Sequence, residues 1–207
     1  LSNTTGTQNV SLGGDSLEAN TTGDYNVAFG VNALKANTTA SNNTGIGKSA
    51  LAANTTGSGN VAVGSGALDA NTTGYNNASL GTSSLGANTT GTENVAVGSN
   101  ALDACTTGNT NVGIGVNSLG ALTTGSGNTA IGDDSVASGV VTGNYNTALG
   151  NSSMDALTSG TLNVGVGRSA LASNTTASNN TAVGASALTA NTTGTGNTAV
   201  GMSALLS

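Results

Sequence analysis

The chain has few residues that could do chemistry. It contains no histidine, one cysteine (Cys105) and one pair of adjacent carboxylates, Asp133 and Asp134. Without histidine, neither a Ser-His-Asp triad nor a histidine-ligated metal can form, and one thiol makes no metal cluster or intrachain disulfide. We therefore expect that the protein is not an enzyme, and we assign no catalytic, cofactor-binding or metal-ligating residue.

The carboxylate pair and the cysteine both have simple structural explanations. Adjacent carboxylates such as Asp133 and Asp134 could begin a weak Ca²⁺ site, but Ca²⁺ takes about six to eight oxygen ligands, and the Gly-Gly-x-Gly-x-Asp repeat of calcium-binding β-rolls is missing. We expect two solvated charges. Cys105 stands where most copies of the repeat described next carry Asn, which favours a tolerated small substituent over a reactive thiol.

These residues belong to a 17-residue unit that fills the chain: Asn-Thr-Thr-Gly, two variable residues, Asn, an apolar triplet, Gly, two further variable residues, and then Ser/Ala-Leu-x-Ala. Such a period is typical of stacked solenoid units that each bury an apolar face against their neighbours. We therefore expect one repeat domain over residues 1–207, with Gly139 as a one-residue insertion. Its twelve coils begin at Asn3, Asn20, Asn37, Asn54, Asn71, Asn88, Cys105, Leu122, Val140, Leu157, Asn174 and Asn191.

The positions of the repeat, numbered 1 to 17 from the first Asn, differ in what they accept. Position 10 is always apolar and position 15 is nearly always Leu, which predicts that both columns form the core. Position 8 shares a face with position 10 because strand side chains alternate. Position 9 is only Ala, Gly or Ser, so we expect close packing there against another chain, and hence a homo-oligomer.

These columns predict an all-β fold, a parallel β-solenoid or β-roll of twelve 17-residue coils. We expect a strand over positions 7 to 10, a corner at the Gly of position 11, a second strand over about positions 14 to 3, and a corner at the Gly of position 4. The Asn at position 7 never changes, which predicts an amide ladder along the axis. Gly after every apolar triplet argues against helices.

Three surface motifs leave alternatives open. Asn-Thr-Thr matches the glycosylation sequon in eight copies, although an Asn and Thr ladder explains the same periodicity without modification. Columns of Thr suggest ice binding as a hypothesis, because regular hydroxyls on one face can match an ice lattice. Adjacent Thr residues point to opposite faces, however, which argues against it. Tyr25, Tyr75 and Tyr145 could stack on sugars or could be scattered surface residues.

The second half of the unit resembles a known family. Asn60-Val61-Ala62-Val63-Gly64 followed by Ala67-Leu68-x-Ala70 is similar to the Ser/Asn-Val-Ala-Ile-Gly head repeats of trimeric autotransporter adhesins. The whole unit looks like the repeats of tail-fibre-like proteins from phages and aquatic bacteria. This resemblance, which covers essentially the whole chain, implies a left-handed parallel β-roll, three chains side by side, and attachment to host cells or matrix. The adhesin unit is shorter, and Asn-Thr-Thr-Gly is extra here.

We therefore expect the structural or adhesive rod of an extracellular fibre, a phage tail fibre or a bacterial surface adhesin. A self-assembling extracellular filament or sheath protein is the alternative, and an ice-binding solenoid is a third hypothesis. The expected partners are further copies of the chain, as homotrimer or filament, and a host-cell surface or matrix receptor. With three basic residues and no run of 18 apolar residues, we expect no nucleic-acid partner and no membrane insertion in this segment. The expected location is extracellular, on a cell surface or a virion.

Overall fold

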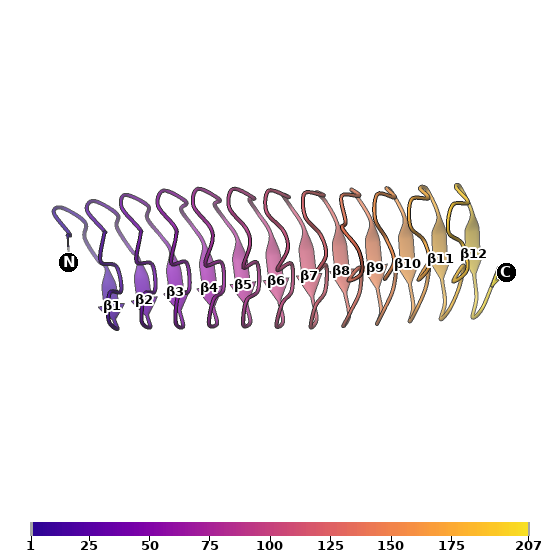
Figure 1. The fold of residues 1–207 in the computed structure, drawn as a ribbon, viewed down its shortest axis with the longest axis horizontal. Helices are drawn as coiled ribbons and strands as arrows, with labels where there is room; N and C mark the ends of the chain where they lie inside the picture. The colour runs from indigo at the N-terminus through magenta and orange to yellow at the C-terminus, as the bar shows by residue number, and fades with distance from the viewer. Residues whose placement is uncertain (1, 207) are drawn as a thin grey trace.

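The computed structural model describes residues 2–206 as one elongated stack of coils. Every coil contributes a three-residue strand, and each strand pairs in parallel with the next one along the chain (Figure 1). The described residues contain no helix, so the predicted all-β parallel solenoid is confirmed. The strands are β1 (Val10–Leu12), β2 (Val27–Phe29), β3 (Thr44–Ile46), β4 (Val61–Val63), β5 (Ala78–Leu80), β6 (Val95–Val97), β7 (Val112–Ile114), β8 (Thr129–Ile131), β9 (Thr147–Leu149), β10 (Val164–Val166), β11 (Thr181–Val183) and β12 (Thr198–Val200).

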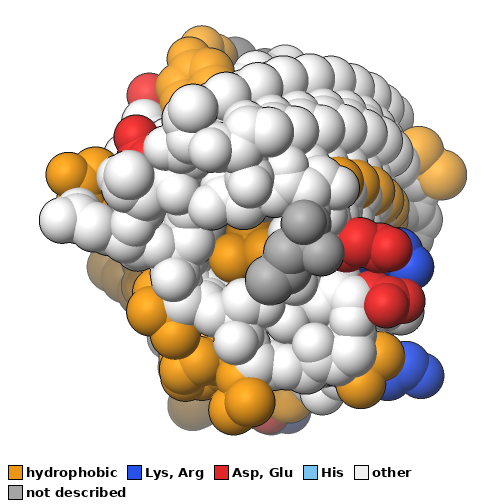
Figure 2. Space-filling model, turned by 90° about the vertical axis from the view of Figure 1, so that its left-hand side faces the viewer, with side chains coloured by type: hydrophobic (Ala, Val, Ile, Leu, Met, Phe, Trp, Pro, Cys, Tyr) orange, Lys and Arg blue, Asp and Glu red, His pale blue; other side chains and the backbone are white. Residues whose placement is uncertain are grey.

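The register of the sheet places equivalent residues of the repeat on top of one another. Between β6 and β7, for example, Val95 pairs with Val112 and Ala96 with Gly113. Between β8 and β9 the offset grows by one, so that Thr129 pairs with Thr147. Seen from the N-terminal end, like side chains therefore form rows that recede along the axis (Figure 2).

The core column at position 15 is confirmed, because Leu34, Leu51 and Leu68 are fully buried. The prediction for position 10 is wrong: Phe29 and Leu80 are 40% and 51% exposed. The prediction for position 9 is wrong as well. Ala96 and its equivalents in the other strands after the first point into the coil and are buried against it, and so are not available to another chain.

The narrow interior of the coil explains why position 9 faces inward and position 10 faces outward. A Cβ placed on Gly45 would lie 3.3 Å from Cγ of Leu34 and 3.1 Å from the carbonyl oxygen of Ala50. The Leu of one coil thus fills the space in front of position 9 of the next coil. Only Ala, Gly or Ser fits there, and the larger side chains at positions 8 and 10 must face outward because strand side chains alternate.

The predicted second strand is wrong too, since positions 14 to 3 form turns, with one isolated bridge between Leu122 and Val141. The Leu at position 15 has a positive φ, for example 55° in Leu102, and position 13 does as well, 57° in Asn100. Alternating left-handed residues cannot continue a strand. Coils still bond to each other here, as Leu102 N–H donates to the carbonyl of Ser118 at 3.0 Å.

The Asn at position 7 makes an axial ladder, as predicted. The Asn60 side-chain oxygen accepts the backbone N–H of Asn77 at 3.0 Å, and the Asn60 amide donates to the carbonyl of Gly74 at 2.8 Å. Asn77 repeats both contacts with the following coil. Because the side chain satisfies a buried backbone N–H, no apolar residue can replace it without leaving that group unpaired.

A second amide ladder runs along position 1 and stops mid-rod. Asn71 donates to the side-chain oxygen of Asn54 at 2.8 Å, and Asn88 donates to Asn71 at 2.8 Å. Cys105 follows and cannot continue the ladder, so the Asn88 side-chain oxygen is buried without a partner. In the three coils after Cys105, the buried side chain in the place of this Asn is apolar: Leu122, Val141 and Leu157. Position 1 therefore tolerates apolar residues, whereas position 7 does not.

The inserted residue changes the register locally. Leu122 bridges to Val141, and Val141 is fully buried while Val140 is 67% exposed. The ninth coil, expected to begin at Val140, thus places the following residue in the interior. Gly139 has a φ of 82°, and the extra residue is accommodated at this surface turn. The sheet continues through β9 without interruption.

Leu102→Ala should destabilise the rod by about 2 to 5 kcal/mol, because it removes a fully buried side chain and leaves a cavity. Val116→Ala, at a 52% exposed position, is the control and should change stability by less than about 0.5 kcal/mol. Chemical denaturation followed by circular dichroism measures both. Equal effects of the two substitutions would contradict the assigned interior.

Asn60→Leu should cost about 1 to 3 kcal/mol more than Asn71→Leu, because only Asn60 accepts a backbone N–H, that of Asn77. Both side chains donate to the carbonyl of Gly74, so each variant leaves that acceptor with one donor. The comparison by denaturation weighs the backbone bond of Asn60 against the side-chain bonds that Asn71 makes with Asn54 and Asn88. A larger loss in Asn71→Leu would show that the position 1 ladder is the essential one.

Candidate functional site: an apolar stripe along the sheet

The outward side chains of the sheet form a continuous surface, here called the apolar stripe. It consists of positions 8 and 10 in every coil, which are the first and last residues of β1–β12. Position 10 is aliphatic in eleven coils and Phe29 in one, and position 8 is Val, Thr or Ala. Since each strand is only three residues long, these two positions are the whole outer face of the sheet.

The stripe is exposed along the rod. In the coils between the two terminal ones, six position 10 residues are 37% to 51% exposed. They are Phe29, Ile46, Leu80, Ile114, Ile131 and Val183. Eleven strand-to-strand steps of about 4.8 Å make the stripe about 53 Å long, and two side chains make it roughly 10 Å wide. The footprint, on the order of 500 Å² and including the five Thr at position 8, lies within the range of the largest apolar patch on a typical soluble monomer, roughly 300 to 600 Å².

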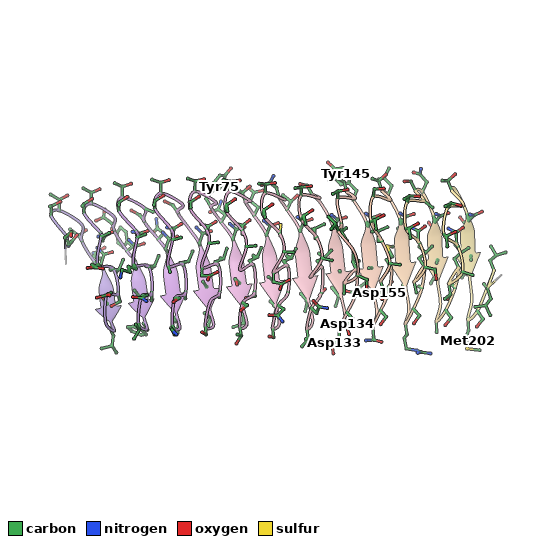
Figure 3. All side chains as sticks on the ribbon, in the orientation of Figure 1. Tyr75, Asp133, Asp134, Tyr145, Asp155 and Met202 are labelled. Atoms are coloured by element: carbon green, nitrogen blue, oxygen red, sulfur yellow. The ribbon has the colours of Figure 1, made fainter. Side chains whose placement is uncertain are left out.

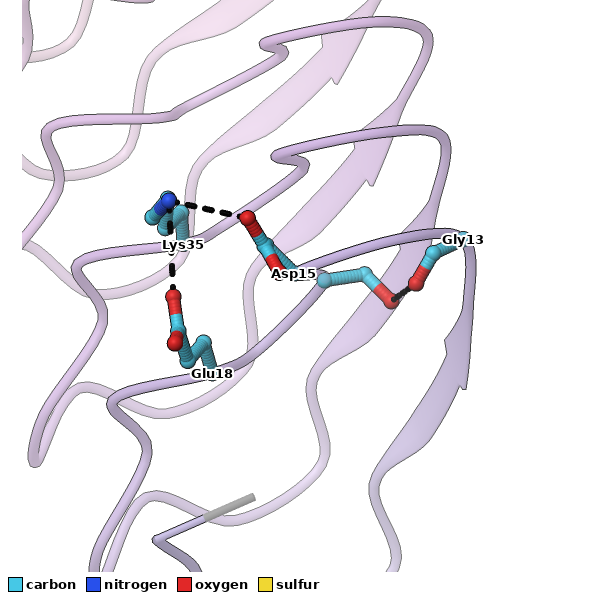
Figure 4. A network of polar contacts seen from close by, with 5 residues as sticks. Gly13, Asp15, Glu18 and Lys35 are labelled. Carbon is cyan, nitrogen blue, oxygen red and sulfur yellow. Dashed lines mark hydrogen bonds and ion pairs between the residues drawn. The ribbon is translucent and has the colours of Figure 1, made fainter.

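Charge is absent from the stripe and placed elsewhere. None of the twelve charged residues of the chain occupies position 8 or 10. Lys35 lies at position 16, where it contacts Asp15 at 3.0 Å and Glu18 at 3.4 Å across neighbouring coils (Figure 4). Its hydrogen bond to Asp15, and then the charge of Asp15, raise the pKa of Lys35. This exposed cluster contributes little stability because water screens it.

The adjacent carboxylates are used within the rod. Asp133 accepts the backbone N–H of Val116 at 3.0 Å, and Asp134 accepts the side-chain amide of Asn117 at 3.0 Å. Among residues 2–206, no three His, Cys, Asp or Glu side chains gather in a way that could hold a metal ion. Burial raises the pKa of Asp69 and Asp103 at position 16, and hydrogen bonds from nearby backbone N–H groups partly oppose this.

The Asn-Thr-Thr sequons have a structural role in the folded chain. Asn37, Asn54, Asn71 and Asn88 are fully buried, and their amide nitrogens donate within the ladder. The first Thr also bonds inside the rod, as the Thr55 hydroxyl donates to the carbonyl of Thr72 at 3.0 Å. The ladder reading of this motif is therefore confirmed.

Cys105 lies in the interior, fully buried beside the carbonyl of Gly108. Burial raises the pKa of the thiol to about 11, and the contact with Gly108 opposes this in part. At neutral pH the group is therefore a protonated, inaccessible thiol.

Sequence reasoning missed the role of position 5. Its short oxygen-bearing side chains accept the backbone N–H of the preceding coil, as Ser126 does from Asn109 at 3.0 Å and Asn144 from Ser126 at 2.7 Å. The frequent Ser, Asn and Asp at this position were a signal for such a bond. Thr at position 8 in five copies was a comparable signal that this column faces outward.

Comparison with protein-family models, with curated proteins and with solved structures gave no match. Within the described residues, no helix has the length and apolar character needed to cross a membrane.

Cys105 should react with a thiol reagent at pH 8 at least about a hundredfold more slowly in the folded chain than in denaturant, because its raised pKa leaves little thiolate. Thr107→Cys in a Cys105→Ala background places a thiol at an exposed position and is the control. Equal rates for Cys105 in the folded and unfolded chain would contradict its burial.

Proposed function

We propose that the chain is the rod of an extracellular fibre that mediates attachment, and that its copies pack side by side through the apolar stripe. The observation that carries this proposal is the outer face of the sheet, which has 24 positions and no charge over the whole length of the rod. An apolar patch at the upper end of the range found on monomers is often functional, and we place the partner there because this one is continuous and uncharged.

The period of the stripe favours a second copy of the chain as that partner. Its side chains repeat once per coil, about every 4.8 Å. An α-helix repeats about every 5.4 Å, so a helix laid along the axis falls half a coil out of register after about four turns. Another copy of this solenoid has the same period and can interdigitate with every coil.

The assembly that we propose is a homotrimer, the arrangement implied by the resemblance to adhesin head repeats and tail-fibre repeats. In such an assembly the apolar stripes face a common axis and the remaining surfaces face water. A rigid uncharged rod suits a fibre, because the same coil can be repeated to extend its reach without changing its cross-section. Attachment to a host-cell surface or matrix is part of the same proposal.

The two alternatives are separated by particular contacts. A filament whose chains associate end to end, through the open edges of the terminal coils, would give open-ended mass in place of a fixed trimer. Ice binding has less support, because the first Thr of each pair donates its hydroxyl to the next coil, as Thr72 does to the carbonyl of Thr89 at 3.0 Å. Only the second Thr of each pair has a hydroxyl that is available to bind ice. A single column of hydroxyls cannot match the two-dimensional lattice of an ice surface.

The test is the mass of the folded protein by sedimentation equilibrium. Wild type should have three times the chain mass, and Leu80→Asp combined with Ile114→Asp should lower that mass, because the assembly would bury unpaired carboxylates. Thr73→Asp with Thr107→Asp introduces the same charges in the same coils on an exposed face, and should leave the trimer unchanged.

A monomeric wild type, or a stripe variant with unchanged mass, would overturn the proposed assembly. Circular dichroism of each variant confirms that the coils remain folded, which the 51% exposure of Leu80 and 37% exposure of Ile114 lead us to expect.

A further inference from the structure

All three tyrosines of the chain lie on one edge of the rod, away from the apolar stripe. Tyr25 and Tyr145 occupy position 6 of the second and ninth coils, and Tyr75 occupies position 5 of the fifth coil. Figure 3 shows Tyr75 and Tyr145 on the same edge, with Asp133 and Asp134 at the opposite one. The three rings are 56%, 48% and 64% exposed in chain order.

The backbone directs these rings outward. Tyr25 and Tyr145 have φ values of 57° and 58°, and position 6 is left-handed in the other coils as well. The Tyr145 ring is also held against the preceding coil: a Cβ on Gly127 would lie 2.6 Å from its Cδ1 atom. Gly127 therefore leaves the space that the Tyr145 ring occupies.

Tyr75 replaces a residue type that supports the fold. The Ser, Asn and Asp residues at position 5 accept a backbone N–H from the preceding coil, as Ser58 does from Ser41 at 3.3 Å. Tyrosine cannot make this bond, because its oxygen lies at the far end of the ring. Among residues 2–206, Thr92, Thr161 and Thr195 at position 5 do not accept this bond either, so the coil tolerates the exposed ring of Tyr75.

The surroundings of the rings are polar and nearly uncharged. At position 3 every coil has Thr or Ser, and within residues 2–206 none of these hydroxyls bonds to another protein group, whereas those at position 2 do. Position 6 adds exposed amides such as Asn42 and Asn179. Asp24 and Glu93 are the only charged residues at positions 3, 5 and 6. We call these three positions of every coil the tyrosine edge.

We propose that the tyrosine edge binds an extended neutral polysaccharide laid along the rod. Tyrosine combines an apolar ring face, which packs on the C–H face of a sugar, with a hydroxyl, and the flanking hydroxyls and amides match sugar hydroxyl groups. Strand spacing of about 4.8 Å places the rings about 14 and 19 Å apart along the axis. A ligand that reaches two rings must therefore be a chain of several sugar units.

This inference rests on the proposed attachment function and names its ligand class. The experiment is affinity electrophoresis of the whole chain in native gels containing soluble starch, yeast mannan, xyloglucan or barley β-glucan. Wild type should be retarded by at least one of them. Tyr25→Ala, Tyr75→Ala and Tyr145→Ala combined should weaken that retardation about tenfold or more, since each ring face contributes to stacking.

Two comparison variants make the result specific. The triple Tyr→Phe variant keeps the ring faces and should retain most of the retardation. Val31→Ala with Val116→Ala removes two side chains that are each 52% exposed at position 12, and should behave as wild type. Retardation by none of the four polysaccharides, or equal retardation of the triple alanine variant, would overturn the proposal.

Sedimentation of the same variants separates this proposal from the proposed assembly. The triple alanine variant should keep the oligomeric mass of wild type, because the tyrosine edge is separate from the apolar stripe. A monomeric wild type that is still retarded through its tyrosines would contradict the proposed trimer and support the polysaccharide site. A trimeric wild type that no polysaccharide retards would support the trimer and contradict the polysaccharide site.

Discussion

The structure depends on the stacking of identical residues at an interval of about 4.8 Å along one axis. At position 7 this stacking has an obligatory partner: each Asn oxygen accepts a backbone N–H from the next coil, as Asn94 does from Asn111 at 2.9 Å. A buried N–H without an acceptor would cost more than a typical side-chain contact provides. The amide ladder therefore fixes the register, and every other column inherits it.

The narrow interior that results determines which residues face inward. The Leu at position 15 fills the space between coils, and in Leu68 it does so with a φ of 51°, in a left-handed conformation that bulky residues rarely adopt. Full burial of the side chain offsets this strain. Position 9 is then restricted to the smallest residues, and the strand turns its larger aliphatic side chains toward the outside.

The surface follows from the same geometry, and it has two specialised faces. The outer face of the sheet presents aliphatic side chains without charge, and the loop edge presents tyrosines, free hydroxyls and amides. Neither face could be built from one coil, since each coil contributes only two or three side chains to it. Repetition makes both surfaces long and regular, and thus favours partners that are themselves periodic, a second solenoid for one face and a polymer for the other.

The sequence alone determined the parallel β-solenoid, the length of its coil, the Leu core at position 15 and the amide ladder at position 7. These depend on periodicity and on residue types whose roles are local, such as Asn60 or Leu68. The direction of positions 8, 9 and 10 was decided only by the tertiary structure. Alternation establishes that Ala96 opposes Val95 and Val97, but which side is interior depends on how much space the neighbouring Leu leaves. The apolar stripe, and the collection of three distant tyrosines on one edge, exist only once the coils are stacked.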